Sequence, residues 1–460
     1  MELFDVIVIG SGGGTKIALP AAKRGLKTAL IERDRFGGTC LNRGCIPSKM
    51  LIYPADLICS IRRGPNVNVR VEPQLDGEFP RLIERVNTTI LQMSDEFRTA
   101  AEALPQLDLI RGHGRFVDNN IIEVNGRRLT APRIYIATGA RPAIPDVPGL
   151  TSTPYMTSTE ALRCLHLPRR MIILGASYIA CELGHIYEAF GCETHFLVRS
   201  SLLRQEDEDV RTAFAEDFRQ RHTLHVGYEP IEVQWTDGLF GVRMRHSDTG
   251  EEQELYSEAL LVSTGIKPVT DELGLENTSI CCDTRGFIQV DDHLQTAASG
   301  VYALGDCVGN YLFRHSVNFE GEYLMRTLFD DPRDEAINYG AVPRAVFAQP
   351  EVAAVGASEV QLQEGKIDYI VGRAAYADSN MGLARQLETG FVKLLFDRSS
   401  RRLLGAHIIG EEASTLIHML ILGLQQQVCI DDLLSLIYIH PALAELIRDA
   451  VRDAQEQLSC

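Results

Sequence analysis

The sequence has no long uninterrupted run of apolar residues, although hydrophobic side chains make up 45% of its 460 residues. A membrane-spanning helix needs about 20 consecutive apolar residues, so we expect no membrane-embedded segment. The first residues also lack the pattern of a secretory signal peptide, and a short strand-like segment stands there instead. These absences lead us to expect a cytoplasmic protein.

Positive charge is also scarce, because 45 lysines and arginines stand against 62 aspartates and glutamates, a formal net charge of −17. An acidic chain repels nucleic acids and anionic lipid surfaces, and no local basic patch offsets this repulsion. We therefore expect neither a nucleic-acid partner nor a membrane partner. The chain is too long for one hydrophobic core, and its length predicts about two to four domains.

Cysteine, in contrast, is plentiful, and two of the eleven cysteines, Cys40 and Cys45, are separated by four residues. Such a pair can close a small disulfide, which stores two electrons. In a reducing cytoplasm, a disulfide that stays oxidised is usually catalytic or sensing. Cys45 precedes Ile46-Pro47-Ser48 and is predicted to open a helix, where free N–H groups and the helix dipole favour a thiolate. On these residues alone, a structural pair or half of a zinc site remains an alternative.

The N-terminal residues predict a dinucleotide-binding unit. Gly10 permits a tight turn after a buried strand, and Gly12 lets the backbone approach a pyrophosphate, to which the following helix offers free N–H groups. Glu32 ends the second strand, at the spacing where a carboxylate accepts both hydroxyls of an adenosine ribose. The predicted elements are a strand at 4–9, a turn from Gly10 to Thr15 that includes Gly14, a helix at 16–23 and a strand at 26–31.

A second unit of the same kind begins near residue 170. Ser177 replaces the central glycine of its turn, so the phosphate approach is less open. Its second strand ends in Arg199, where an NAD site would carry an acid, and Arg204 follows nearby; cations there suit the 2′-phosphate of NADP. Solvated surface arginines are the alternative. The predicted elements are a strand at 170–174, a turn from Gly175 to Ala180, a helix at 181–190 and a strand at 193–198.

Two similar turns flank this second unit in the sequence. Ala137-Thr138-Gly139 follows a buried strand, and Ser263-Thr264-Gly265 follows another, so the chain is predicted to return there to a discontinuous first domain. Asp306, after a short strand, carries a carboxylate that could bind a sugar alcohol. Between the first two units, residues 79–103 predict a helix, and residues 108–129 predict a small antiparallel meander.

A third, mixed domain is predicted from about residue 342, where strands at 345–347, 367–373, 391–396 and 403–409 alternate with helices. Near its end, His440 stands five residues before Glu445, across a proline turn. This spacing can form an imidazole–carboxylate pair that holds one tautomer. Taken alone, a lone histidine is more often structural.

Together, these motifs closely resemble the FAD-dependent pyridine nucleotide–disulfide oxidoreductases, the family that includes dihydrolipoamide dehydrogenase, glutathione reductase, mycothione reductase and mercuric reductase. The resemblance runs essentially from end to end, and the Cys40–Cys45 block is its most specific part. It implies an α/β fold with two Rossmann-like dinucleotide-binding domains, the second inserted in the first, and an α+β C-terminal dimerisation domain. The implied segments are 1–147 and 268–338 for FAD, 148–267 for NAD(P) and 339–460 for the dimer interface.

The resemblance also implies a role for each matching residue. Cys45 would face the flavin and Cys40 would exchange with the substrate disulfide, while His440, with Glu445 behind it, would act as acid–base catalyst from the partner subunit of a homodimer. Lys49 would lie beside the flavin and pair with Glu182, and Tyr178 would gate the nicotinamide pocket. The implied FAD residues are Gly10, Gly12, Gly14, Glu32, Gly38, Thr39, Thr138, Gly139 and Asp306, and the implied nicotinamide dinucleotide residues are Gly175, Tyr178, Ile179, Glu182, Arg199, Arg204 and Gly265. No metal is implied.

The substrate is predicted to be a lipoyl dithiol or disulfide, free or on a protein, because the Cys40 block is most similar to dihydrolipoamide dehydrogenase. Lys16 stands near the place where glutathione-type enzymes usually carry an arginine, and the single Cys460 does not form a terminal cysteine pair of the mercuric reductase kind. Another small disulfide, such as mycothione or glutathione, or mercuric ion is the alternative, and a non-enzymatic zinc or redox protein is a remote one. The pair Cys281-Cys282 is interpreted as structural. Arg43, between the two redox cysteines, is a further cation that could favour a thiolate. As the nicotinamide cofactor, NADP is favoured over NAD.

Overall fold

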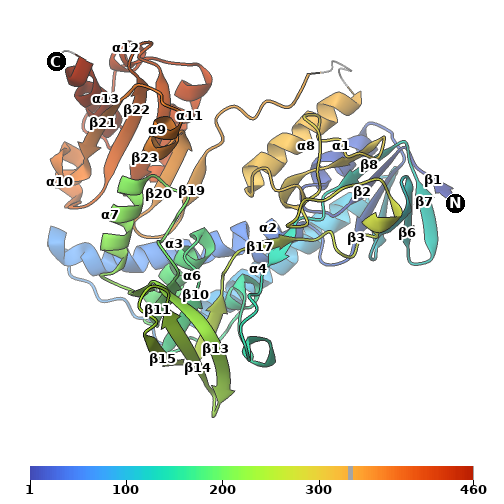
Figure 1. Ribbon diagram of the computed structural model, residues 1–460, viewed down its shortest axis with the longest axis horizontal. Helices are drawn as coiled ribbons and strands as arrows, with labels where there is room; N and C mark the ends of the chain where they lie inside the picture. The colour runs from blue at the N-terminus through green and yellow to red at the C-terminus, as the bar shows by residue number, and fades with distance from the viewer. Residues whose placement is uncertain (330–334, 459–460) are drawn as a thin grey trace. The chain divides into compact units, whose positions relative to one another are not determined.

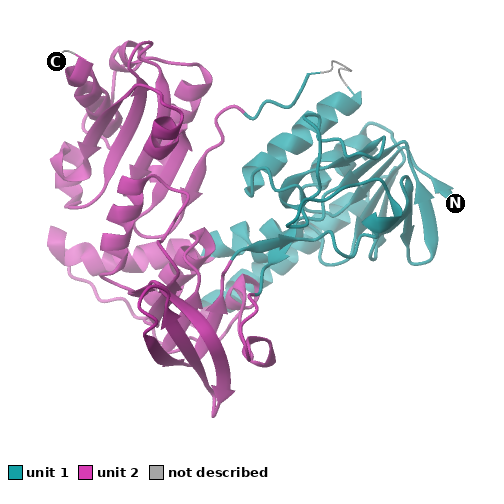
Figure 2. Cartoon of the chain, in the orientation of Figure 1, with its two compact units in different colours: residues 1–50, 82–144, 265–339 teal, residues 51–81, 145–264, 340–460 magenta. Residues whose placement is uncertain are grey.

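The structure, a computed structural model, describes residues 1–329 and 335–458, so Cys460 lies outside the described residues. The chain forms two compact units (Figure 2). Unit 1 contains residues 1–50, 82–144 and 265–339, and unit 2 contains residues 51–81, 145–264 and 340–460. Within the described ranges, no helix combines the length and the apolar character that crossing a membrane would require.

Unit 1 is built on a five-stranded parallel sheet of strand order β18-β8-β2-β3-β4 (Figure 1). Every residue of β2 is buried, as expected for a parallel strand covered on both faces. Val6 and Val8 pack with residues of α1 and α8 on one face, while Ile7 and Ile9 pack with a second sheet on the other. The elements are β2 (Val6–Ile9), α1 (Thr15–Lys23), β3 (Thr28–Glu32), β4 (Leu107–Arg111), β8 (Arg133–Ile136), β18 (Val301–Ala303) and α8 (Arg314–Phe329).

The second sheet of unit 1 has the strand order β1-β7-β6-β5, and it corrects the predicted meander. Only β5, β6 and β7 form the antiparallel meander, because β4 pairs in parallel with β3 and thereby extends the main sheet. The remaining elements are β1 (Glu2–Leu3), α2 (Gly38–Arg43), α3 (Cys45–Arg63), α4 (Glu78–Glu102), β5 (Arg115–Asp118), β6 (Ile121–Val124), β7 (Arg127–Thr130), β9 (Ala140–Pro142) and β17 (Ile266–Pro268); α3 and α4 contain residues of both units.

Unit 2 contains a four-stranded parallel sheet of order β12-β11-β10-β16. Helix α6 begins at Tyr178, three residues before the predicted start, and follows the turn after β10 directly. An antiparallel sheet, β13-β14-β15, was not predicted. The elements are α5 (Ser158–Ala161), β10 (Arg170–Leu174), α6 (Tyr178–Ala189), β11 (Glu193–Val198), α7 (Glu208–Phe218), β12 (Thr223–Val226), β13 (Tyr228–Thr236), β14 (Leu239–His246), β15 (Glu252–Ser257) and β16 (Ala259–Val262).

The C-terminal part of unit 2 is an antiparallel sheet of order β19-β20-β23-β22-β21, with α11 packed on β20 and β23 and α13 on β21 and β22 (Figure 1). Strand β20 was missed by the sequence analysis. The elements are β19 (Arg344–Val346), β20 (Val352–Gly356), α9 (Glu359–Glu364), β21 (Tyr369–Ala375), α10 (Asn380–Arg385), β22 (Phe391–Asp397), β23 (Leu403–Ile409), α11 (Ala413–Gln425), α12 (Ile430–Leu434) and α13 (Glu445–Leu458).

Candidate active site

The glycine-rich turn of unit 1 lies at the carboxyl end of β2, between its neighbours β8 and β3. This is the point in an open parallel sheet where dinucleotides bind. Gly10 has a φ of +102°, and a Cβ there would lie 2.3 Å from the Ala137 carbonyl oxygen. A Cβ on Gly14 would lie 2.3 Å from the Gly10 carbonyl oxygen, so this glycine permits the close approach of α1. These contacts hold the N-terminus of α1 close to the end of β2, the arrangement in which dinucleotide-binding folds offer free backbone N–H groups to a phosphate.

Glu32 ends β3 beside this turn. Its Oε2 accepts hydrogen bonds from the backbone N–H of Ser11 at 2.9 Å and from the Ser11 hydroxyl at 2.5 Å. The Ser11 hydroxyl in turn accepts from the Gly37 N–H at 2.9 Å. The carboxylate predicted to hold a ribose is thus oriented by the turn predicted to hold the pyrophosphate, and both connect to the segment that precedes Cys40.

The redox motif spans the short helix α2 and the first residue of α3, and its first part lies close to the same turn. A Cβ on Gly38 would lie 2.5 Å from the Gly12 Cα, so the two backbones meet at a contact that only glycine permits. Between the cysteines, the buried Asn42 amide donates to the carbonyl oxygens of Phe36 at 2.9 Å and Gly38 at 3.0 Å. Cys45 begins α3, as predicted, and Cys40 lies in the short helix α2, which was not predicted.

Both Cys40 and Cys45 are half-buried free thiols, and they share a hydrogen bond. This bond lowers the pKa of Cys40 to about 7, with smaller contributions from the positive charges of Arg314 and Lys49. The same bond, together with burial, raises the pKa of Cys45, because Cys45 keeps the proton that the pair shares. In the dithiol, these shifts favour ionisation at Cys40 over ionisation at Cys45.

These shifts favour a thiolate at Cys40, whereas the helix N-terminus favours one at Cys45, and the thiolate at Cys45 stays a prediction. Arg43, the cation expected to assist, instead forms a 2.5 Å ion pair with Asp34. Arg314, at the start of α8, was missed by the sequence analysis because it is 274 positions (314 − 40) from Cys40 in the chain.

Asp306 provides the test of whether unit 1 suits a polyol-bearing cofactor. Asp306 is half-buried, and burial raises the pKa of its carboxyl group. Within residues 1–329 and 335–458, no group donates a hydrogen bond to this carboxylate, which fits an acceptor for sugar hydroxyls. The turn that carries it is fixed by Glu320, which accepts from the Gly305 N–H and from the Tyr339 hydroxyl, both at 2.6 Å.

The other predicted flavin-site residues of unit 1 lie in turns and helix starts. Thr39 is in α2, and Thr138 and Gly139 follow β8. The turn at Gly139 and the turn at Gly265 both adopt positive φ and lead into the paired strands β9 and β17. The residues predicted to bind FAD therefore belong to one compact unit and fit a dinucleotide with a polyol chain.

In unit 2, the turn after β10 begins, like the turn in unit 1, with a glycine of positive φ packed against the backbone of a neighbouring segment. Gly175 has a φ of +132°, and a Cβ there would lie 2.1 Å from the Ser263 carbonyl oxygen. Tyr178 begins α6, Ile179 is exposed, and Glu182 lies one turn further along the helix. The Glu182 carboxylate accepts the Phe347 N–H at 3.1 Å. Lys49 belongs to unit 1 and Glu182 to unit 2, and their pairing stays a prediction.

The arginines predicted to select NADP lie at the carboxyl end of β11. Arg199 is exposed and lies 3.7 Å from Glu229, and Arg204 is also exposed. Beside them is a hollow of about 310 Å³ lined by Ser200, Ser201, Leu202, Glu208, Arg211, Thr212, Ala215, Glu216, Arg219, Leu224 and Val226. Arg211, which lines this hollow, donates to the Ser201 hydroxyl at 3.2 Å. It is a third cation near the end of β11, and the sequence analysis missed it.

His440 and Glu445 are brought together by the loop before α13. The His440 Nδ1 lies 3.0 Å from Oε1 and 3.1 Å from Oε2 of Glu445, and a carboxylate only accepts, so Nδ1 carries the proton. Glu445 also accepts the Ala442 N–H at 3.1 Å and an Arg448 N–H at 2.8 Å. The bond from His440 lowers the pKa of Glu445. This arrangement leaves Nε2 of the exposed His440 available for proton exchange.

Among the described residues of unit 2, two clusters of metal-ligating side chains occur, and each lies against a cationic side chain. Asp207, Asp209 and Glu359 surround the Lys393 ammonium group. The other cluster is Cys59, His185 and Glu188. There, an Arg221 nitrogen lies 3.6 Å from Glu188 and 3.4 Å from the His185 Nδ1, and Arg62 lies 3.4 Å from Glu188.

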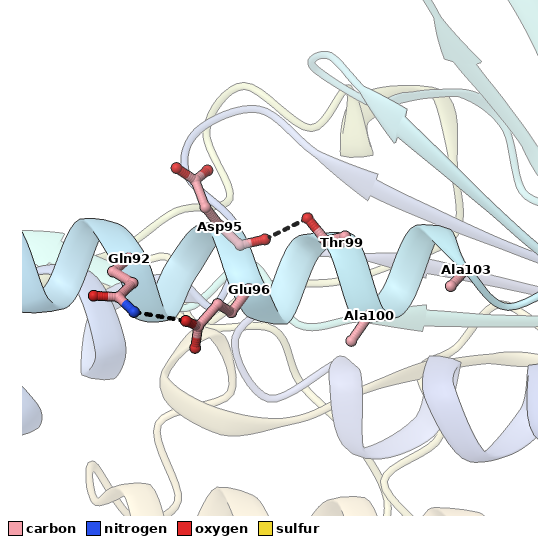
Figure 3. A pocket seen from close by; sticks show the side chains of 6 residues that line it. All are labelled: Gln92, Asp95, Glu96, Thr99, Ala100 and Ala103. Atoms are coloured by element: carbon pink, nitrogen blue, oxygen red, sulfur yellow. Dashed lines mark hydrogen bonds between the residues drawn. The ribbon is translucent and has the colours of Figure 1, made fainter.

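Neither the hollow along α4 nor the Cys281-Cys282 pair contains a residue that was predicted to bind a cofactor or to take part in catalysis. The hollow in Figure 3, about 590 Å³, runs along α4 and is lined by Gln92, Asp95, Glu96, Thr99, Ala100 and Ala103. Its polar side chains bond along the helix itself, as the bond from the Gln92 amide to Glu96 shows. Cys281 and Cys282 are exposed, and Cys282 forms an isolated antiparallel bridge with Ile288.

Comparison with known families identifies the class of this protein. Residues 4–323 match the pyridine nucleotide-disulphide oxidoreductase family, and residues 342–451 match its dimerisation domain. The chain belongs to this family. The predicted α/β fold class is confirmed by the parallel sheets and by both matches, and membership implies FAD and a pyridine nucleotide as cofactors. The second match points to a homodimer.

Relatives with different substrates resemble the chain to similar degrees. It is 33% identical over 469 residues to mycothione reductase of Mycobacterium tuberculosis, covering 98% of this chain and 99% of that one. It is 31% identical over 455 residues to dihydrolipoyl dehydrogenase of Chlamydia trachomatis, covering 97% and 95%. Among solved structures, the HOCl-induced flavoprotein disulfide reductase RclA of Escherichia coli superposes with a TM-score of 0.86 at 27% identity, covering 97% of this chain and 99% of that chain.

Proposed function

We propose that this protein is a flavoprotein disulfide oxidoreductase that passes electrons between a nicotinamide nucleotide and a lipoyl-type dithiol or disulfide. The observation that carries the proposal is the Cys40–Cys45 pair, in which one thiol is poised to ionise near neutral pH beside the dinucleotide turn. When bound, FAD supplies two-electron transfer between the nicotinamide and Cys45. Glu32 and Asp306 would orient it through its ribose and its ribityl chain.

In this proposal, Cys40 exchanges with the substrate and Cys45 closes the disulfide behind it. His440 of a second copy would accept and return the proton through Nε2, while Glu445 holds Nδ1. Support for a homodimer comes from the loop before His440, where Ile437 is fully exposed and Ile439 is 79% exposed. Large exposed apolar side chains next to a functional residue are typical of an interface.

The test is an anaerobic titration of the purified flavoprotein with lipoamide, mycothione and glutathione disulfides and with both nicotinamides. Reduction of lipoamide disulfide at a rate at least comparable with the other disulfides supports the proposal. Efficient turnover of mycothione disulfide without lipoamide turnover would instead support the second candidate, a reductase of another small disulfide. That candidate is favoured by the 33% identity to mycothione reductase.

Replacing His440 with alanine is expected to slow thiol–disulfide exchange about 10²- to 10⁴-fold, the usual contribution of a general acid–base. Flavin reduction by the nicotinamide should survive, because that step does not use the imidazole. Stopped-flow measurement of the two half-reactions separates the effects. The control is His418→Ala, since His418 is also exposed but bonds the Ser414 carbonyl oxygen. Equal loss of both half-reactions in His440→Ala would contradict the assigned role.

We further propose that NADP(H) is preferred, because Arg199, Arg204 and Arg211 gather positive charge at the carboxyl end of β11. Arg199→Glu is expected to raise KM for NADPH about tenfold, the loss of roughly one charge-assisted hydrogen bond, and to leave NADH turnover nearly unchanged. Arg169→Glu is the control, since this exposed arginine immediately precedes β10, at the opposite end of the sheet. Equal use of both nucleotides, unaltered by Arg199→Glu, would contradict the preference.

A further inference from the structure

The Tyr178 side chain is tied to a buried carboxylate. Its hydroxyl donates a hydrogen bond to Glu206, whose side chain is only 1% exposed. Tyr178 is itself half-buried, and burial raises its pKa, so the phenol stays protonated and acts as the donor. A bond from a phenol to a buried carboxylate is stronger than a neutral one. The ring therefore has one favoured position.

Glu206 is in turn held from two directions. The Arg344 Nε lies 2.9 Å from Oε1 and 3.0 Å from Oε2 of the carboxylate. The backbone around Glu206 is tied to the turn before α6, because the Leu203 N–H donates to the Ala176 carbonyl oxygen at 2.9 Å and the Glu206 N–H donates to the Leu203 carbonyl oxygen at 2.8 Å. A buried carboxylate costs free energy unless it is paired, and Arg344 provides that pairing.

Arg344 begins β19, in the part of the chain that matches the dimerisation domain. Just after the same strand, the Phe347 N–H donates to Glu182 at 3.1 Å. Strand β19 and the residue after it therefore restrain both side chains that are predicted to lie at the nicotinamide. Arg344 restrains Tyr178 through Glu206, and the Phe347 N–H restrains Glu182 directly. Strand β19 pairs with β20, so Arg344 is supported by an ordered sheet.

We propose that Glu206 and Arg344 form a latch that holds the Tyr178 ring in place, so that the C-terminal domain controls access of the nicotinamide to its site. This inference rests on the proposed function, in which Tyr178 gates that site. When the ring turns aside to admit the nicotinamide, the bond from its hydroxyl to Glu206 must break. The latch therefore opposes nucleotide binding, and Glu206 and Arg344 are positioning residues that act through Tyr178.

The experiment measures the affinity of the complete flavoprotein for reduced nicotinamide nucleotide, by nucleotide fluorescence under anaerobic conditions with no disulfide present. Tyr178→Phe keeps the ring and removes the latch bond. The pair Glu206→Leu with Arg344→Met removes the acceptor without leaving a buried charge unpaired. Tyr187→Phe is the matched control, because Tyr187 lies on the same helix and its buried hydroxyl donates to the Ala161 carbonyl oxygen at 2.7 Å.

Tyr178→Phe is expected to tighten nucleotide binding about tenfold, the equivalent of one net hydrogen bond. The Glu206→Leu/Arg344→Met variant should match it, the triple variant should gain nothing more, and Tyr187→Phe should change nothing. Unchanged or weakened binding in Tyr178→Phe, or effects that add in the triple variant, would overturn the latch. The same variants separate this inference from the proposed function: a flavoprotein that shows the expected affinities but reduces no disulfide contradicts the function alone.

Discussion

Replacing Cys40 with serine is expected to lower disulfide reduction by at least about 10³-fold, because the variant loses the only nucleophile assigned to the substrate. Flavin reduction by the nicotinamide should persist. Cys281→Ser is the control, since Cys281 is an exposed thiol with no assigned part in the reaction. Steady-state disulfide turnover and a dye-reduction assay measure the two activities.

The pH dependence of the same site gives a sharper test. The Cys40 thiol has a pKa of about 7, so its alkylation by iodoacetamide should rise with pH and reach half of its maximum near pH 7. In Cys45→Ala, the hydrogen bond from the neighbouring thiol is lost, and this midpoint should move up towards the ordinary cysteine pKa of about 8.5. Preferential alkylation of Cys45 at low pH would contradict the assignment and restore the thiolate at the helix N-terminus.

Replacing Lys393 with methionine is expected to lower the free energy of unfolding by about 3–5 kcal/mol, the usual effect of breaking a buried ion pair. The Lys393 side chain is 1% exposed and its ammonium group contacts Asp207 at 2.8 Å, Asp209 at 2.8 Å and also Glu359. Removing the cation leaves these carboxylates facing one another. Chemical denaturation followed by tryptophan fluorescence measures the change.

The control for this variant is Arg398→Met, because Arg398 pairs with Asp368 on the surface at 3.0 Å. An exposed pair contributes at most about 1 kcal/mol, so this variant should stay close to the wild-type stability. Similar losses in Lys393→Met and Arg398→Met would show that the buried cluster contributes no more than an ordinary surface pair.

Acid should weaken the same cluster. Burial alone would raise the pKa of Asp207, but the hydrogen bond and charge of Lys393 outweigh it, and the pKa is lowered. A lowered carboxyl pKa contributes stability above the unfolded value, about 3.9, and this contribution is lost as the pH falls through the folded value. The wild-type protein should therefore lose more stability below about pH 4 than Lys393→Met does.

The local motifs were readable from the sequence because they depend on a few neighbouring residues. Gly10 and Gly175 need positive φ values that only glycine adopts freely, and strand–turn–helix patterning surrounds each of them. Cys45 begins a helix, and His440 bonds Glu445 five residues later, as their spacing predicts. The sequence by itself therefore determined the fold class, the two dinucleotide turns and the candidate redox pair.

Only the tertiary structure decided which side chains meet across long stretches of chain. Lys393 reaches Asp207 over 186 positions, and Arg344 reaches Glu206 over 138 positions. Such pairs leave no local pattern, because burial makes an ion pair worthwhile only after sheets and helices have packed. The lowered pKa of Cys40 is of the same kind, since it depends on the sulfur–sulfur hydrogen bond and on the charge of the distant Arg314. The spacing of residues in the sequence located the redox pair and the dinucleotide turns, whereas tertiary packing decided which charged groups lie near them.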